Sequence, residues 1–395
     1  MDFQLVGAIV FVVVLAVLLY LYRSKLILQK VLFPLIYILM YKSRLGINFM
    51  NLGSKYPRFF RIMGLIGTIV GFIGMVLIAV LLIQNVLMIL IVPDTAPAVM
   101  PVLPVNVDGV FYVPFFYWIL VIIVIAAVHE FAHGIIARSY DIKIKSSGLA
   151  VVGLIVPLLP AAFVEPDEKQ LGKRQKRQQL SVFSAGSFAN VLLGLFAVLA
   201  LFALTPVTDS LFDSAGVEIT KIAEGGLTYP AKAAGMQVGE VITAIDGRQT
   251  LTRDDFILIM ETKRPGDLIE VKTGKSTYVV TLAKNIKDPS KPYLGIEAQE
   301  KVIVDPLIEE KIGSFIPYFA VSTWKFFYWL FLLSIGIGLF NLLPLGPLDG
   351  GRMLLVALQR FFSANMAAKI WKYVSTFFFV IVMFLLFLVL KGFFS

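Results

Sequence analysis

Long runs of apolar residues alternate with short polar stretches along most of this chain, and one extended polar region interrupts them. An apolar run of about 20 residues is long enough for a helix to cross a lipid bilayer. The pattern therefore predicts a polytopic α-helical membrane protein with one extramembrane domain. The predicted spans cover residues 6–22, 63–92, 115–138, 180–205, 315–343 and 366–390.

Composition agrees with this pattern and narrows the chemistry. Of the 395 residues, 58% are hydrophobic and 15% are charged, whereas soluble domains carry about 25% charged residues. The chain has no cysteine, so any zinc ligands must be His, Asp or Glu. The net charge of +9 comes from basic residues beside the apolar runs, as topology signals and anionic lipid headgroups explain. We therefore expect no nucleic-acid partner.

The charge pattern also predicts an orientation. Residues 23–61 carry eight basic residues and no acidic one, which is typical of a cytoplasmic segment. Within this segment, the apolar stretch 31–40 is too short to span, so we expect it to lie in the interface or to dip into the membrane and return. The proline-rich stretch 93–114 has no basic residue and is expected outside. This places the N-terminus and the polar region outside the cytoplasm.

The sequence His129-Glu130-Phe131-Ala132-His133 ends an apolar run and contains both histidines of the chain. Residues four apart share one face of a helix, so the two imidazoles can bind one metal ion. Glu130 then stands where a carboxylate can deprotonate a metal-bound water. The alternative is a chance match on a solvated helix. An ionisable cluster in an apolar span favours the metal site, because it is costly unless it is functional.

Two further segments bear on this site. Residues 146–164 are apolar but broken by glycine and proline, which favours a β-hairpin that dips into the membrane over an interfacial loop. The segment that starts at Asn341 is broken by Pro344 and Pro347 and leads to Asp349. Asp349 is either a helix cap or the third metal ligand, and its pairing with the histidine motif favours the ligand. Asn190 lies within a span, either as an interhelical hydrogen bonder or as part of the site.

Residues 206–313 form the polar region. Its segment 230–247 resembles PDZ domains attached to bacterial-type membrane proteases, followed by a helix-like stretch at 252–263 and strand-like stretches at 268–273 and 277–282. PDZ domains bind extended peptide ends by adding a strand to a sheet edge. Alternatively, the domain only restricts access to the site.

Together, HEFAH in one span, Asn341 followed by the LDGGR sequence at 348–352, and the intervening PDZ-like region resemble the site-2 protease family of intramembrane zinc metalloproteases. The resemblance covers residues 118–383. It implies Zn²⁺ bound by His129, His133 and Asp349, with Glu130 as general base and then acid. It also implies that 146–164 is a re-entrant hairpin whose edge, around Gly148, Val151 and Gly153, holds substrate as a strand. Gly186, Asn190 and Asn341 match family motifs, whereas Ser187 stands where the family usually has proline.

The chain is thus expected to have four parts: N-terminal segments and an outer loop (1–114), the first half of the protease core (115–205), a PDZ domain (206–313) and the second half of the core (314–395). The expected function is cleavage of membrane-spanning protein substrates within the bilayer, in its cytoplasmic half, with the PDZ domain as a substrate filter. Asn341 and Asn190 are candidates to hold the substrate or the oxyanion. Competing interpretations are a zinc protease with a water-exposed site and a glutamate as third ligand, and a PDZ-bearing scaffold or transporter with a relic motif.

Overall fold

The computed structural model describes residues 3–32, 36–44, 46–92, 95–104, 110–154, 156–223, 229–285 and 288–394. The chain divides into two compact units, which are described separately. The first unit comprises Met1–Leu201 and Lys325–Ser395, and the second comprises Phe202–Trp324. The polar region predicted from the sequence lies within the second unit.

Six of the described helices are long and apolar enough to cross a membrane, as predicted. Glycines of α4 are buried where other helices pack against it, and a Cβ added at Gly64 would lie 2.9 Å from the Ser181 side chain. Glycines at such positions allow helices to pack closely. The six helices are α1 (Phe3–Leu21), α4 (Pro57–Ile91), α5 (Phe115–Ser139), α7 (Lys176–Asp209), α11 (Phe315–Asn341) and α13 (Ala364–Phe394).

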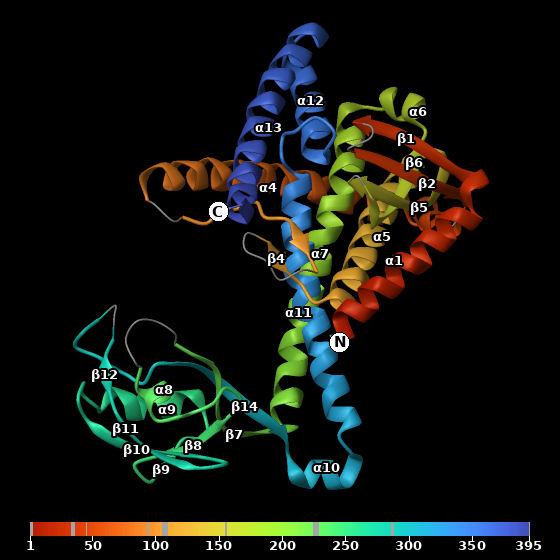
Figure 1. Ribbon diagram of the computed structural model, residues 1–395. Helices are drawn as coiled ribbons and strands as arrows, with labels where there is room; N and C mark the ends of the chain where they lie inside the picture. Colours follow the sequence, from red (N-terminus) through yellow and green to blue (C-terminus); the bar gives the residue numbers. More distant parts are fainter. Residues whose placement is uncertain are drawn as a thin grey trace. The chain divides into compact units, whose positions relative to one another are not determined.

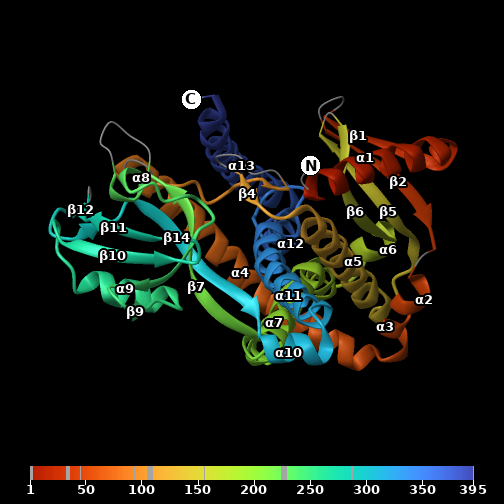
Figure 2. The same cartoon turned by 60° about the horizontal axis from the view of Figure 1, so that its bottom comes forward.

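The first unit also contains a four-stranded antiparallel sheet beside α5 (Figures 1 and 2). Its strands follow the order β1 (Leu26–Leu32), β2 (Ile36–Ser43), β5 (Ile144–Leu154) and β6 (Val156–Pro166). The last two strands form the hairpin predicted at 146–164. The described part of the stretch 31–40, residues 31–32 and 36–40, belongs to strands that extend this hairpin. Its placement in the interface or within the membrane stays a prediction.

β5 is an inner strand of this sheet, so the prediction that its edge is free for a substrate is wrong. Gly148, Val151 and Gly153 pair with Lys42, Leu39 and Tyr37 of β2, respectively. A Cβ added at Gly148 would lie 2.1 Å from the Tyr41 carbonyl oxygen, and one at Gly153 would lie 2.3 Å from the Tyr37 ring. The glycines of β5 therefore allow the close approach of a strand from the same chain.

The predicted break in the second half of the core lies between α11 and α12 (Asp349–Phe361). α11 ends at Asn341, and the following turn leads to Asp349 at the start of α12. Gly350 and Gly351 are needed here, because added Cβ atoms would lie 2.0 Å and 2.2 Å from the carbonyl oxygens of Leu342 and Leu345. The two glycines thus allow the first turn of α12 to fold back on the turn before it, which fixes Asp349.

The second unit contains an antiparallel sheet with the strand order β11-β10-β8-β7-β14, and β9 pairs with β8. Its helix α9 starts with a capping box, in which Thr252 and Asp255 exchange side-chain to backbone hydrogen bonds. The helix and strands predicted at 252–263, 268–273 and 277–282 are all present. The elements are β7 (Phe212–Ile222), α8 (Pro230–Ala233), β8 (Val241–Ile245), β9 (Arg248–Gln249), α9 (Arg253–Glu261), β10 (Leu268–Thr273), β11 (Thr277–Thr281), β12 (Ala283–Lys284), β13 (Pro292–Tyr293), β14 (Ile296–Val304) and α10 (Pro306–Ile312).

Short elements connect the larger ones in the first unit. They are a 3₁₀ turn (Arg23–Lys25), α2 (Ile47–Met50), α3 (Leu52–Lys55), β3 (Val102–Leu103), β4 (Phe111–Tyr112) and α6 (Glu168–Gly172). Among these, α2 and α3 pack on α5. Met50 of α2 is fully buried, in one cluster with Ile136 and Ala137 of α5. These contacts support the end of α5 that carries the histidines.

Candidate metal centre

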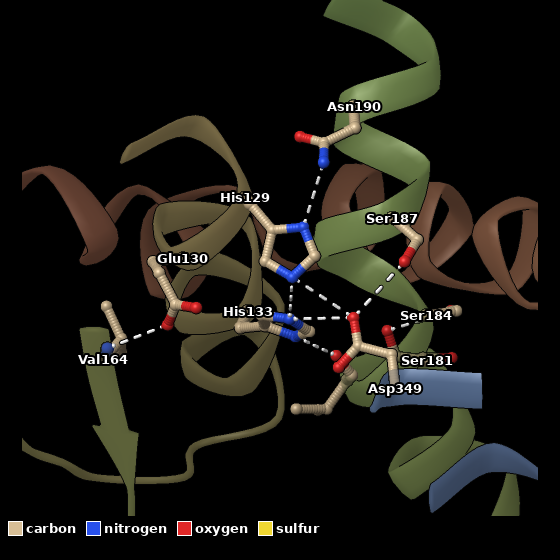
Figure 3. A network of polar contacts seen from close by, with 10 residues as sticks. His129, Glu130, His133, Val164, Ser181, Ser184, Ser187, Asn190 and Asp349 are labelled. Atoms are coloured by element: carbon tan, nitrogen blue, oxygen red, sulfur yellow. Dashed lines mark hydrogen bonds and ion pairs between the residues drawn. The ribbon is translucent and has the colours of Figure 1, made fainter. Parts of the chain in front are cut away.

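Three side chains from two helices converge on one point in the first unit (Figure 3). The Nε2 atoms of His129 and His133 lie 3.2 Å apart. The Asp349 Oδ2 atom lies 3.2 Å from the first of these nitrogens and 3.3 Å from the second. The side chains are 11–14% exposed. The three atoms therefore form a nearly equilateral triangle of metal-binding type, as the sequence predicts.

The helix α7 forms one wall of this centre. Gly186 lies so close to the histidines that an added Cβ would be 2.4 Å from His133 Nε2 and 2.5 Å from His129 Nε2. No other residue type leaves room for the imidazole nitrogens at this position. Gly186 is therefore part of the centre, because its lack of a side chain leaves space for the two imidazoles.

Glu130 points from α5 toward β6 (Figure 3), where its Oε2 atom accepts a hydrogen bond of 2.9 Å from the Val164 backbone N–H. Val164 is the Cα partner of Ser147 in the β5–β6 ladder. Because the Val164 N–H donates to Glu130, it points away from β5 and toward the outer edge of the hairpin. Glu130 thus contacts the strand edge and lines the same cavity as the metal-binding side chains.

A cavity of about 680 Å³ adjoins these groups. It is lined by the two histidines, Glu130 and Asp349, together with Val164 of β6. Asn341 also lines the cavity, where a substrate can reach it. Asn190 is instead fully buried behind His129, and its side-chain amide lies 3.2 Å from His129 Nδ1. Asn190 therefore contacts a ligand and does not face the cavity, so it fits the interhelical alternative better than an oxyanion donor.

A comparison with models of protein families shows to which family this chain belongs. A family model described as Peptidase family M50 matches residues 117–385, which include every residue of the metal centre. The chain belongs to peptidase family M50. The resemblance to site-2 proteases is thereby confirmed.

Several curated proteins resemble this M50 member. The uncharacterized protein MJ0971 of Methanocaldococcus jannaschii is 29% identical over 239 residues, which cover 60% of this chain and 56% of that protein. The putative zinc metalloprotease CPE1693 of Clostridium perfringens is 24% identical over 66% of this chain and 88% of its own length. The zinc metalloprotease RasP of Geobacillus kaustophilus is 27% identical over 50% of this chain and 54% of its own. The chain thus spans about half the length of MJ0971 and RasP.

Two solved structures resemble a part of this M50 chain. The PDZ domain of an SdrC-like protein from Listeria innocua covers 21% of this chain and 92% of that structure, with 22% identity and a TM-score of 0.18. The corresponding domain from Listeria monocytogenes has the same identity and TM-score, and 86% of it is covered.

The donor geometry of the M50 centre fits zinc. Zinc accepts tetrahedral nitrogen and oxygen ligands at about 2.0–2.2 Å, which separates neighbouring ligand atoms by about 3.3–3.5 Å. The three distances of 3.2–3.3 Å match this spacing. No glutamate joins the three ligands among the described residues, so the alternative of a zinc protease with a glutamate ligand finds no support here.

The structure thus brings together the residues that the motifs indicate and separates the others. Gly148, Val151 and Gly153 of β5 face β2 and do not line the cavity. Two backbone groups that contact the site were not predicted from the sequence. The Val164 N–H contacts Glu130, and the Val182 carbonyl oxygen lies 2.7 Å from His133 Nδ1. Backbone contacts of this kind depend on the fold and not on the residue type.

Proposed function

We propose that this protein is a zinc-dependent intramembrane endopeptidase that cleaves membrane-spanning segments of other proteins. The observation that carries the proposal is the triangle of His129 Nε2, His133 Nε2 and Asp349 Oδ2, beside Glu130 and between helices long enough to span a bilayer. From the charge pattern, we assign the active site to the cytoplasmic half of the bilayer. We assign the N-terminus and the PDZ-like region to the opposite side.

A zinc ion bound by the three side chains would lower the pKa of a water to about 7 and polarise the peptide carbonyl. Glu130 takes the proton from the attacking water and then transfers it to the leaving amide nitrogen. Asn341 lines the same cavity, and we assign its amide to the substrate backbone or to the developing oxyanion.

A helical substrate must unwind before its peptide carbonyl is accessible, and unpaired backbone groups are costly in lipid. We assign the replacement hydrogen bonds to the outer edge of β6, because β5 is paired on both sides and β6 is the terminal strand on the cavity side. The outer edge offers the Val164 N–H and, by alternation, the Ala162 N–H. A substrate carbonyl that accepts the Val164 N–H would release Glu130 from this bond.

The PDZ-like region is assigned to the recognition of peptide ends. Support comes from the match of its predicted helix and strands to the second unit, whose sheet ends in β11 and β14 among the described strands. Addition of an extended peptide to a sheet edge is how PDZ domains bind. In this role the region admits substrates whose outer part has already been shortened.

The test is cleavage of a single-span substrate by the purified full chain in detergent, with zinc measured on the same samples. Glu130→Gln is expected to retain zinc and to lose cleavage, because the amide cannot accept the proton. Asp349→Ala is the matched control and is expected to lose zinc as well. Undiminished cleavage by Glu130→Gln would refute the assignment of Glu130, and wild-type protein without zinc would refute the metalloprotease.

A further inference from the structure

The helix α7 presents one hydrogen-bonding group to each of the three metal-binding side chains (Figure 3). The Val182 carbonyl oxygen lies 2.7 Å from His133 Nδ1, and the Asn190 amide lies 3.2 Å from His129 Nδ1. The Ser187 hydroxyl donates to Asp349 Oδ2 at 3.3 Å. Gly186 lies among these residues and leaves the space that the ligands occupy. One helix thus contacts all three ligands from behind.

The contact with Val182 fixes the tautomer of His133. A carbonyl oxygen only accepts hydrogen bonds, so the proton of the neutral imidazole must lie on Nδ1. The lone pair of Nε2 is then free and directed at the other two ligands. A metal ion requires this tautomer, because a protonated nitrogen cannot bind it.

His129 needs the same tautomer, and Asn190 can provide its acceptor. With the amide as oriented in the structure, Nδ2 faces the ring, and Asn190 Oδ1 is buried without a hydrogen-bond partner among the described residues. A half-turn of the amide exchanges the two atoms with no change of shape. Oδ1 then accepts the His129 Nδ1–H, which removes a buried unpaired acceptor that costs about 1–3 kcal/mol.

Ser187 adds a side-chain hydroxyl contact to the centre. It stands where the sequence motif of site-2 proteases usually has proline, which has no hydroxyl group. Ser187 is fully buried, and its hydroxyl donates to the same Asp349 oxygen that faces both imidazoles. This bond restrains the carboxylate in the orientation in which one oxygen is the ligand.

We propose that Ser187 and Asn190 are positioning residues of the metal centre, which hold Asp349 and His129 in their zinc-binding orientations. The inference rests on the proposed zinc site and explains which residues hold its ligands in place before the metal binds. Hydrogen-bond partners of metal ligands typically contribute a factor of about 10–100 in metal affinity. α7 therefore determines how tightly the centre binds zinc without supplying a ligand.

The experiment measures the zinc dissociation constant of the purified full chain in detergent, by competition with a chromophoric chelator. Asn190→Leu and Ser187→Ala are each expected to weaken binding by a factor of about 10–100. Asn190→Asp keeps an acceptor at the same place and is expected to bind zinc at least as tightly as the wild type. Ser184→Ala is the matched control, because Ser184 is a buried serine of the same helix whose hydroxyl bonds to Ser181 and Thr68.

Two outcomes separate this inference from the proposed function. Wild-type protein that binds no zinc would overturn the metalloprotease itself. Wild-type binding with Asn190→Leu and Ser187→Ala within twofold of it would overturn the positioning role alone. The absorption spectrum of the cobalt-substituted protein is a second readout, since a displaced ligand changes the coordination geometry. If Asn190→Leu does not fold, Ser187→Ala decides by the same criterion, and weaker zinc binding by Asn190→Asp than by the wild type would overturn the acceptor role of Asn190.

Discussion

Replacing Gly186 by alanine tests the geometry of the metal centre most directly. The added Cβ would lie 2.4 Å from His133 Nε2 and 2.5 Å from His129 Nε2, whereas ordinary van der Waals contacts begin at 3.4 Å. Each imidazole must therefore move by about 1 Å, or α7 must move away as a whole. The methyl group also occupies space next to the nitrogen lone pairs that would bind zinc.

The size of the effect follows from this overlap. Overpacking in a close-packed interior typically costs 1–3 kcal/mol. Without metal, the two imidazoles can turn away from the added methyl group, so the cost falls mainly on the metal-bound state. At a factor of ten per 1.4 kcal/mol, this cost corresponds to about 5–150-fold weaker zinc binding. Cleavage of a membrane substrate should fall at least as much at zinc concentrations near the wild-type dissociation constant.

The assay is the zinc competition titration, with cleavage measured at two zinc concentrations. Gly336→Ala is the control, because an added Cβ at Gly336 of α11 meets no atom within 4 Å. It should leave zinc binding unchanged and stabilise the helix by up to about 1 kcal/mol. Gly186→Ala with zinc affinity within twofold of the wild type would refute the placement of α7 against both histidines.

Two further predictions concern the strand edge and the second unit. Val164→Pro removes the N–H that contacts Glu130 and is expected to abolish cleavage while zinc binding persists. Val164→Ala retains the N–H and is expected to keep both cleavage and zinc binding. Efficient cleavage by the proline variant would exclude the β6 edge as the substrate site. Burial raises the pKa of Asp246, but the Lys263 ammonium at 2.6 Å and the Glu270 N–H outweigh it and hold the pKa below its usual 3.8. The stabilisation from Asp246 is thus present above about pH 4 and is lost as pH falls through the lowered pKa. The protection of the Glu270 amide, which is its exchange rate compared with the intrinsic rate at the same pH, should fall below pH 4 in the wild type and change less in Asp246→Asn.

The sequence was sufficient to identify the three side chains of the candidate metal centre because their signals are local and rare. His129 and His133 are the two histidines of the chain and stand one helical turn apart. Asp349 follows prolines that must end a helix, so it could be assigned to an interrupted segment at the site. In each case the residue type and its immediate neighbours carry the chemistry. Gly186 could be matched to a motif in the same way, but its physical role needs the distances to both imidazoles.

The N-terminal strands could not be predicted in the same way. A ten-residue apolar stretch such as 31–40 is ambiguous between strand and helix by periodicity. Its partner lies far along the chain, since Met40 pairs with Ala150. Strand pairing between such distant segments has no signature in either segment alone. This long-range pairing moved the expected substrate edge from β5 to β6.

The position of prolines on β6 bears on how a membrane substrate can be opened. Pro160 and Pro166 lie on the same side of the strand as Ala162 and Val164, by alternation, and have no N–H. The outer edge therefore offers N–H donors only at residues 162 and 164 within this segment. Every unwound residue outside their reach would leave backbone groups unpaired in lipid, at several kcal/mol each. If a substrate binds at this edge as proposed, an edge of this length stabilises only a few extended residues, and we expect the substrate to remain helical on both sides of the peptide bond presented to Glu130.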